Sequence, residues 1–341
     1  MTDVRHARAR QPFTPVPQRE QTCRSTSTVR GDAVQNPSPV IAWAESPLQL
    51  IGVAEWAALH ETRVPLAGRL TPQMSETADE LIGRGALFGH CEPYLGIPWT
   101  LLANHSHWLV GDGYSGQFRL AAAILRPRRV TFLDDGANAI AYADSLLGHR
   151  PYARPGVAEG WPTRLLVPFA LEQILGRAIA GGVELFTAFD FGERRSTALG
   201  DLGARVERHR FEWTRASARA FTTTTGGRVL LGSARPVDGR MPLEDYLAWV
   251  TREASTAPVT YIPHRRESAA QRQAVAAITG VTFTDRSLPV ELLLAGTTEP
   301  LEILTLPSST TTTLPPLLEG TGSVIRCRDA ESSRMGGSVS A

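Results

Sequence analysis

The chain has 341 residues, of which 42% are hydrophobic and 20% charged, and its formal net charge is +1. The length favours two α/β domains over one, and the near-zero net charge gives no reason to expect a nucleic-acid partner. All 35 Lys and Arg residues are arginine, which excludes a lysine Schiff base or a P-loop lysine from any mechanism.

Cysteine usage and hydropathy bear on the compartment. The three cysteines, Cys23, Cys91 and Cys327, are widely spaced and form no CxxC pair. That pattern predicts neither a disulfide framework nor a structural zinc site. No apolar run approaches the ~18 residues that span a bilayer, and the first residues lack a signal-peptide core. We therefore expect a cytoplasmic protein.

Composition divides the chain into four parts. Residues 1–37 are rich in Arg, Thr, Ser, Gln and Pro, and residues 326–341 are small and polar. Such segments bury too little apolar surface to offset the entropy of ordering. We expect both to be disordered, with a misassigned start codon as the alternative for the first. A run of Thr and Gly at 222–227 predicts a boundary between an N-terminal domain (38–225) and a C-terminal domain (226–325).

Apolar runs alternate with helix-like runs in the N-terminal domain. Strands are predicted at 40–44, 63–70, 108–111, 130–133 and 183–189, and helices at 48–60, 117–125 and 138–147. Such alternation favours a parallel, doubly wound sheet.

The C-terminal domain has the same alternation. Strands are predicted at 228–232, 259–262, 281–284 and 301–306, and helices at 243–254, 269–278, 289–295 and after 307. The chain is therefore expected to be an α/β protein of two Rossmann-like domains, with ligands outside the carboxyl ends of the strands.

The first polar motif at a strand end is Asp134-Asp135-Gly136. A carboxylate there could take a proton from a substrate hydroxyl. The alternative is a turn in which an Asp only caps the following helix. Adjacent carboxylates can also hold Mg²⁺, but no D-x-D spacing accompanies them, and we expect no metal site.

The second motif is His264, which follows a strand and precedes Arg265. Imidazole and guanidinium groups both donate hydrogen bonds to phosphate oxygens, so these residues indicate an anion site. The alternative is an exposed basic loop that covers the end of the sheet.

The third motif is Ser308-Ser309, between a strand and a helix. Hydroxyl and N–H groups at a helix N-terminus can hold a phosphate, although N-capping is their common use. A carboxylate in one domain and phosphate-type donors in the other match a nucleotide sugar bound between two domains.

Five short motifs in this order resemble the bacterial alpha-2,8-polysialyltransferase and lipooligosaccharide sialyltransferase family. The resemblance covers roughly residues 39–325, and its motifs are Ala44-Glu45-Ser46-Pro47-Leu48-Gln49-Leu50, Asp134-Asp135-Gly136, Tyr261-Ile262-Pro263-His264, Leu288-Pro289-Val290-Glu291 and Ser308-Ser309. It implies a GT-B fold with two parallel sheets facing a central cleft. It also implies inverting, metal-independent transfer of sialic acid or a related nonulosonate from a CMP-activated donor.

The same resemblance implies roles for individual residues. Asp134 would be the general base, with Asp135 as the next candidate, and His264 would bind and protonate the departing phosphate. The donor would also contact a second set of residues: Ser308, Ser309, Glu291 at the ribose, Gly136 and Arg265. Ser46 and Gln49 are further candidates. Arg265 stands where the family has proline, a departure that leaves the donor sugar open.

The resemblance further implies a glycan or glycolipid acceptor for surface polysaccharide, and peripheral contact with the inner membrane face through that acceptor. Alternatives remain open. The chain could be a GT-B enzyme with another nucleotide sugar, an epimerase-like enzyme, or a non-catalytic nucleotide- or glycan-binding protein.

Overall fold

The computed structural model describes residues 40–134, 136, 138–157, 160–223, 226–284 and 288–328. The predicted disordered segment 1–37 lies outside the described residues, as do Asp135 and all residues after Arg328. Residues 38–341 cluster as one unit by their contacts.

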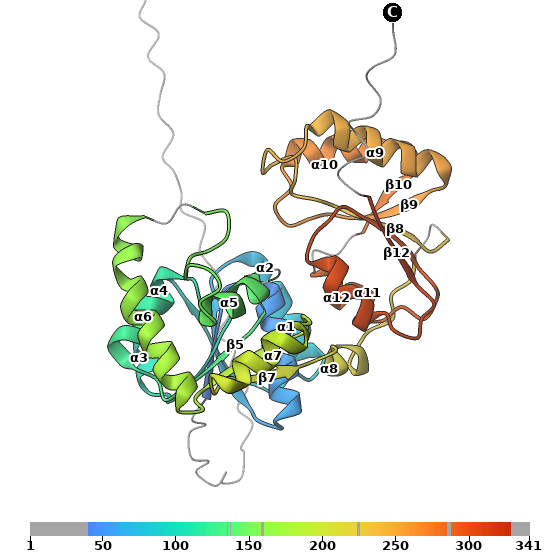
Figure 1. Ribbon diagram of the computed structural model, residues 1–341. Helices are drawn as coiled ribbons and strands as arrows, with labels where there is room; N and C mark the ends of the chain where they lie inside the picture. The colour runs from blue at the N-terminus through green and yellow to red at the C-terminus, as the bar shows by residue number, and fades with distance from the viewer. Residues whose placement is uncertain are drawn as a thin grey trace, which may run out of the picture. The chain divides into compact units, whose positions relative to one another are not determined.

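The first half of the chain forms a seven-stranded parallel sheet in the order β3-β2-β1-β4-β5-β6-β7. In Figure 1 this half is coloured from blue to yellow-green, with β5 and β7 labelled. Its strands are β1 (Val40–Ala44), β2 (Val64–Arg69), β3 (Phe88–Tyr94), β4 (His107–Val110), β5 (Arg129–Phe132), β6 (Val183–Thr187) and β7 (Arg205–Arg208). The helices between them are α1 (Pro47–Leu59), α2 (Pro72–Gly83), α3 (Trp99–Ala103), α4 (Gly116–Leu125), α5 (Asn138–Leu146), α6 (Trp161–Ile179) and α7 (Gly192–Asp201).

After α8 (Glu212–Ala216), a second parallel sheet has five strands in the order β10-β9-β8-β11-β12. They are β8 (Arg228–Leu231), β9 (Val259–Ile262), β10 (Val281–Phe283), β11 (Glu302–Thr305) and β12 (Val324–Cys327). Its helices are α9 (Leu243–Thr256), α10 (Ala269–Ala276), α11 (Val290–Leu294) and α12 (Thr310–Leu317). β12 continues past residue 325, where the sequence predicts the end of the C-terminal domain.

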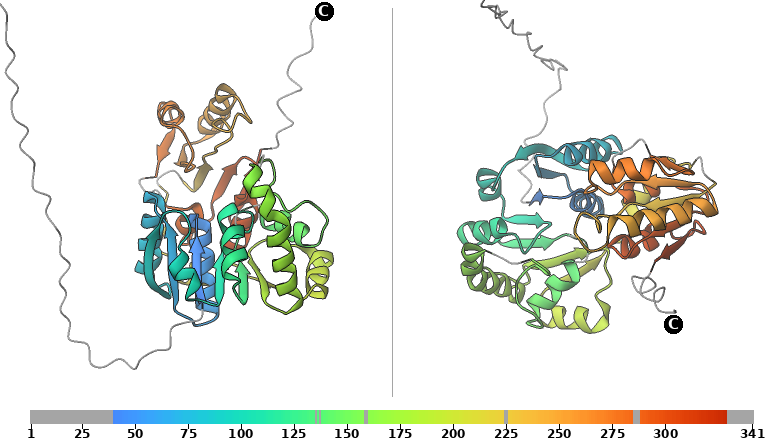
Figure 2. Two further views of the ribbon diagram at one scale, coloured as in Figure 1. Left: turned by 90° about the vertical axis from the view of Figure 1, so that its left-hand side faces the viewer. Right: turned by 90° about the horizontal axis from the view of Figure 1, so that it is seen from above.

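The central strand β1 shows why the first sheet needs helices on both faces (Figure 2). All five of its residues are buried. Val40, Ala42 and Ala44 belong to one hydrophobic cluster, whereas Ile41 and Trp43 belong to another. Successive side chains of a strand point to opposite faces, so an unbroken apolar run is what a doubly covered parallel strand requires.

Strand order reverses once in each sheet. In the first sheet β1 pairs on one side with β2 and on the other with β4, and Ala42 lies opposite both Leu66 and Leu109. In the second sheet β8 lies between β9 and β11, and Leu230 lies opposite Tyr261 and Leu304. These reversals are the positions at which open α/β sheets bind ligands.

Both sheets confirm the predicted α/β fold with two Rossmann-like units. Every predicted strand and helix is present with ends shifted by a few residues. Among the residues that the structure describes, no helix is both long and apolar enough to cross a membrane.

Candidate functional site

Three loops leave the carboxyl ends of the central strands of the second sheet. One follows β8 at Gly232, one follows β9 and carries His264, and one follows β11 and carries Ser308 and Ser309. Two of the predicted motifs therefore lie at the strand-order reversal of this sheet.

His264 is a neutral hydrogen-bond donor in this loop. Burial, together with the nearby Arg266 and Arg265, lowers its pKa to about 4 against the opposing effect of Asp238. Its Nδ1 accepts the backbone N–H of Arg266 at 3.2 Å, which assigns the single proton of the neutral ring to Nε2. At neutral pH the imidazole can therefore donate from Nε2 to an anion.

The serine pair begins α12 without capping it. Ser309 is the N-cap residue, but its side chain makes no capping hydrogen bond. Ser308 is exposed, and its Oγ lies 2.7 Å from the Thr310 hydroxyl. The N–H groups that begin a helix carry partial positive charge and favour an anion. Capping therefore does not account for these two hydroxyls.

Arg235 is a cation of this site that the sequence did not reveal. Its Nη2 donates to the carbonyl of Pro307 at 3.2 Å, next to the serine pair, and its backbone N–H donates to Ser233 Oγ at 3.2 Å. Among the described residues it has no carboxylate partner. Arg266, by contrast, forms a bidentate pair with Asp238 at 2.9 and 2.8 Å.

Glu291 and Arg265, the other predicted donor contacts, differ in exposure. Glu291 is 6% exposed and accepts the Thr313 hydroxyl at 2.8 Å, which ties α11 to α12. Burial raises the pKa of Glu291. Arg265 is exposed beside His264. Glu291 thus supports the helix that follows the serine pair, whereas Arg265 is open to solvent.

Asp134 lies at the end of β5 in the first sheet. The side chain is 3% exposed and accepts hydrogen bonds from the Thr187 hydroxyl and from the Ala188 N–H at 2.6 Å. His209 Nε2 lies 3.5 Å from its Oδ2. The carboxylate therefore joins the ends of β5 and β6.

Gly136 brings the Asp134 loop close to the serine pair. Its φ of +62° lies in the left-handed region that favours glycine. A Cβ placed on Gly136 would lie 3.5 Å from Ser309 Cβ. Two motifs that are about 170 residues apart in the sequence are thus in van der Waals range.

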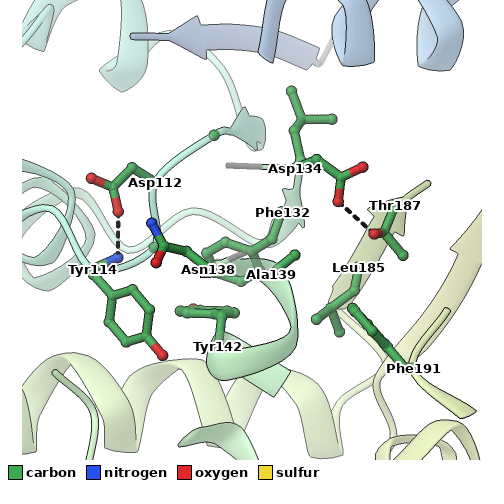
Figure 3. Close-up of a pocket in the computed structure, with 13 residues that line it drawn as sticks. Asp112, Tyr114, Phe132, Asp134, Asn138, Ala139, Tyr142, Leu185, Thr187 and Phe191 are labelled. Carbon is green, nitrogen blue, oxygen red and sulfur yellow. Dashed lines mark hydrogen bonds between the residues drawn. The ribbon is translucent and has the colours of Figure 1, made fainter. Parts of the chain in front are cut away.

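A small cavity lies beside Asp134 at the ends of β4, β5 and β6 (Figure 3). Its apolar wall is mainly aromatic and consists of Tyr114, Phe132, Leu133, Tyr142, Leu185 and Phe191. Asp112 and Asp134 lie at opposite sides of it, and the Asp134 side chain points towards Thr187 (Figure 3).

Asp112 is a second carboxylate of this cavity that the motif search missed. It is 6% exposed, accepts the Tyr114 N–H at 2.9 Å and contacts the guanidinium of Arg154. A Cβ on Gly113 would lie 2.2 Å from the Tyr142 ring. The Gly-Asp-Gly sequence after a buried strand was the available signal.

Ser46 and Gln49 form the capping box of α1. Gln49 Oε1 accepts the N–H groups of Glu45 at 2.6 Å and Ser46 at 3.2 Å, and Ser46 Oγ accepts the Gln49 N–H at 3.5 Å. Both residues are buried. They shape the strand-order reversal of the first sheet.

Within the described ranges, no group of three or more His, Cys, Asp or Glu side chains could hold a metal ion.

No family model matches the chain, and no curated protein matches it. Among solved structures, it is similar to a UDP-glucose:anthocyanidin 3-O-glucosyltransferase in complex with UDP, with 11% identity, 85% of this chain and 80% of that chain covered, and a TM-score of 0.47. It is also similar to a Staphylococcus aureus MnaA–UDP structure, with 11% identity, coverage of 82% and 77%, and a TM-score of 0.49.

A third solved structure is the Escherichia coli heptosyltransferase WaaC with ADP, with 9% identity, coverage of 84% and 92%, and a TM-score of 0.39. These likenesses are too distant to assign an activity, and the sialyltransferase resemblance stays a prediction. What the chain does is therefore inferred from its own residues.

Proposed function

We propose that the chain is a glycosyltransferase that takes a sugar from a nucleotide-activated donor, with inversion and without a metal ion. The donor phosphate is held by Arg235, His264 and the start of α12. The acceptor reaches the donor from the Asp134 side. Transfer breaks the bond between the anomeric carbon and the phosphate oxygen and forms one to the acceptor oxygen, whose proton goes to a base.

One observation carries the donor half of this proposal. The Arg235 guanidinium, which has no carboxylate partner among the described residues, lies at the Pro307 carbonyl beside the N-terminus of α12. A fixed guanidinium and the partial positive charge at a helix N-terminus stabilise the negative charge that develops on a leaving phosphate. Neutral His264 adds a donor at Nε2.

The acceptor half rests on the approach of Gly136 to Ser309. It brings the Asp134 loop within reach of the phosphate site, and Asp134 remains the proposed base. Asp135, which lies outside the described residues, is the next candidate.

The nucleotide base is the open part of the proposal. A CMP-linked nonulosonate follows from the family resemblance alone, and a phosphate site of this kind accepts other nucleotides equally well. We therefore propose a nucleotide sugar as the donor class and leave the base to a binding experiment.

Calorimetry with CMP, UDP, ADP and GDP tests the donor site in the wild type, in Arg235→Gln and in Arg252→Gln. Arg252 is an exposed arginine of α9 that pairs with Glu253 at 3.7 Å, so this control removes the same charge elsewhere. We expect Arg235→Gln to weaken the preferred nucleotide roughly 10- to 100-fold, because a hydrogen bond to a charged group contributes ~1.5–3 kcal/mol. Arg252→Gln should match the wild type.

Turnover of the matching nucleotide sugar then tests the reaction, with and without EDTA. Activity that persists in EDTA supports the metal-independent mechanism. No binding of any nucleotide overturns the donor site, and tight binding without transfer or hydrolysis indicates a binding protein. A preference for UDP or ADP over CMP rules out the sialic-acid donor.

A further inference from the structure

Beneath the His264 loop lies a buried polar cluster, made of Glu267, Tyr261, Tyr246, Gln271 and Ser233, for which the proposed chemistry has no use. Glu267 is 7% exposed and Gln271 is 1% exposed. They lie where α10 begins, below the carboxyl ends of β8 and β9. Burial of an acidic side chain costs free energy unless its hydrogen bonds offset the loss of water.

Glu267 makes its contacts through one oxygen. Its Oε1 accepts the backbone N–H of His264 at 2.9 Å and the Tyr261 hydroxyl at 2.8 Å. The Tyr261 hydroxyl in turn lies 2.6 Å from the hydroxyl of Tyr246 in α9. The carboxyl group thus joins the His264 turn to β9 and α9.

The end of β8 is shaped around the same oxygen. A Cβ on Gly232 would lie 2.0 Å from Glu267 Oε1 and 2.6 Å from the His264 N atom. On the next residue, the Ser233 carbonyl accepts Gln271 Nε2 at 2.9 Å. Glu267 and Gln271 therefore join the loops that follow β8 and β9.

The turn itself fixes the imidazole. The Glu267 N–H donates to the His264 carbonyl at 3.0 Å, and the Arg266 N–H donates to His264 Nδ1 at 3.2 Å. Because Glu267 accepts the His264 N–H, the backbone of His264 cannot shift without leaving this donor unpaired. The Nδ1 acceptor, and with it the Nε2–H donor, depends on this turn.

The second oxygen of Glu267 shows which protonation state the cluster suits. Glu267 Oε2 and Gln271 Oε1 are both buried and have no hydrogen-bond partner. A carboxylate would leave a charged oxygen buried without a donor, whereas a carboxylic acid carries no charge at that oxygen. Burial raises the pKa of Glu267 against the opposing effects of the His264 N–H, the Tyr261 hydroxyl and Arg272.

From these contacts we propose that Glu267 is a positioning residue for His264: its carboxyl group holds the turn in which the imidazole keeps its proton on Nε2 and presents it to the donor phosphate. This role rests on the proposed function only in that the ligand of His264 is taken to be the donor phosphate. The orientation and tautomer of His264 are properties of the free protein.

The first test is a spectroscopic one on the unliganded protein. ¹⁵N-labelled wild type, Glu267→Gln and Glu267→Ala are compared by NMR at the imidazole nitrogens, and the His264 signals are assigned by their loss in His264→Gln. We expect the wild type and Glu267→Gln to show the Nε2–H tautomer, because the glutamine oxygen still accepts the His264 N–H. Glu267→Ala should show a mixture of tautomers.

The second test measures kinetics on the preferred nucleotide sugar. Glu267→Gln should keep kcat within about threefold, and Glu267→Ala should lose roughly 10- to 100-fold in kcat, the size expected when a catalytic group moves by about 1 Å. Tyr246→Phe is the matched control. It removes a buried hydroxyl from the cluster but not the bond to His264, so it should lower the melting temperature without changing the tautomer.

A folded Glu267→Ala with wild-type His264 signals overturns the positioning role. If Glu267→Ala does not fold, Glu267→Asp replaces it, because its shorter side chain draws the carboxyl group away from the His264 N–H. It should give a partial shift of the same signals, and unchanged signals in this variant also overturn the role. If no nucleotide sugar is turned over, the proposed function fails, but the NMR result still decides the role of Glu267.

Discussion

Asp134 is buried, where it joins the ends of β5 and β6, and it is also the proposed base. Mutations can separate the structural role from the catalytic one. Asp134→Asn keeps the side-chain shape but cannot accept a proton. We expect transfer to fall by roughly 10²-fold or more, with nucleotide affinity within about twofold of the wild type, because the lost interaction acts in the transition state. Kinetics and calorimetry on one preparation measure both.

The control for Asp134→Asn is Thr187→Val, which removes the hydroxyl that donates to the same carboxylate. It should lose about 1.5–3 kcal/mol of unfolding free energy and retain most of its transfer activity. If Thr187→Val loses transfer as fully as Asp134→Asn, Asp134 acts by holding the ends of β5 and β6, and Asp135 becomes the candidate base.

Single residues differ in how far the sequence could locate them. Asp134 and His264 directly follow predicted strands, so the strand pattern alone placed them at sheet ends. Arg235 could not be found in this way, because its partner Pro307 is 72 residues away. Glu267 was equally hidden, because burial and the contact with Gly232 arise only after β8 and β9 are paired.

At the level of elements, the central strands were predictable, whereas β10 was the one edge strand of the described sheets that the sequence predicted. β1 and β9 are fully buried apolar runs. β7, with the sequence RVER, and β12, with the sequence VIRC, are edge strands whose residues are largely exposed or half-buried. Edge strands are commonly short and charged. α6 was missed because Pro168 interrupts its helical pattern.

The contact between Gln49 of α1 and Gly111, which follows β4, offers a test of how tightly these elements pack. A Cβ on Gly111 would lie 1.8 Å from Cδ of Gln49. Because Gln49 is buried and forms the capping box of α1, it cannot move away freely. Gly111→Ala should therefore lose roughly 2–4 kcal/mol of unfolding free energy, through overpacking and the lost cap.

Gly68→Ala is the control for Gly111→Ala, because nothing lies within 4 Å of a Cβ at that position in β2. We expect it to be neutral or to stabilise by up to about 1 kcal/mol. Urea unfolding of the three proteins gives the comparison. Equal stability of Gly111→Ala and the wild type would contradict tight packing between Gly111 and Gln49.

For the whole molecule, His107 makes the free energy of unfolding depend on pH. Its Nε2 lies 2.8 Å from Thr131 Oγ1, whose own proton goes to Glu184 at 2.7 Å, so neutral His107 is the donor. Burial, aided by Arg129, lowers its pKa from 6.5 to about 4. The unfolded chain thus binds the proton more readily, and this stabilisation is full above pH 6.5 and is lost as the pH falls towards 4.

Urea unfolding at pH 7 and pH 4 compares the wild type with His107→Gln and with His90→Gln. Between pH 7 and pH 4, we expect the wild type and His90→Gln to lose on the order of 1–2 kcal/mol more unfolding free energy than His107→Gln. The His90 side chain is 78% exposed. Glu267 and Glu291, whose pKa values burial raises, act in the opposite direction in all three proteins. Equal losses in all three would contradict a neutral, buried His107.

The two cysteines among the described residues have a practical consequence. Cys91 lies on β3 and Cys327 on β12, which are edge strands of different sheets. Burial and Asp79 raise the pKa of Cys91, whereas Cys327 is exposed. Because the thiolate is the reactive form, a maleimide dye at neutral pH should label Cys327 first in a Cys23→Ser protein. A second dye at higher pH then labels Cys91, which gives one fluorescent reporter per sheet.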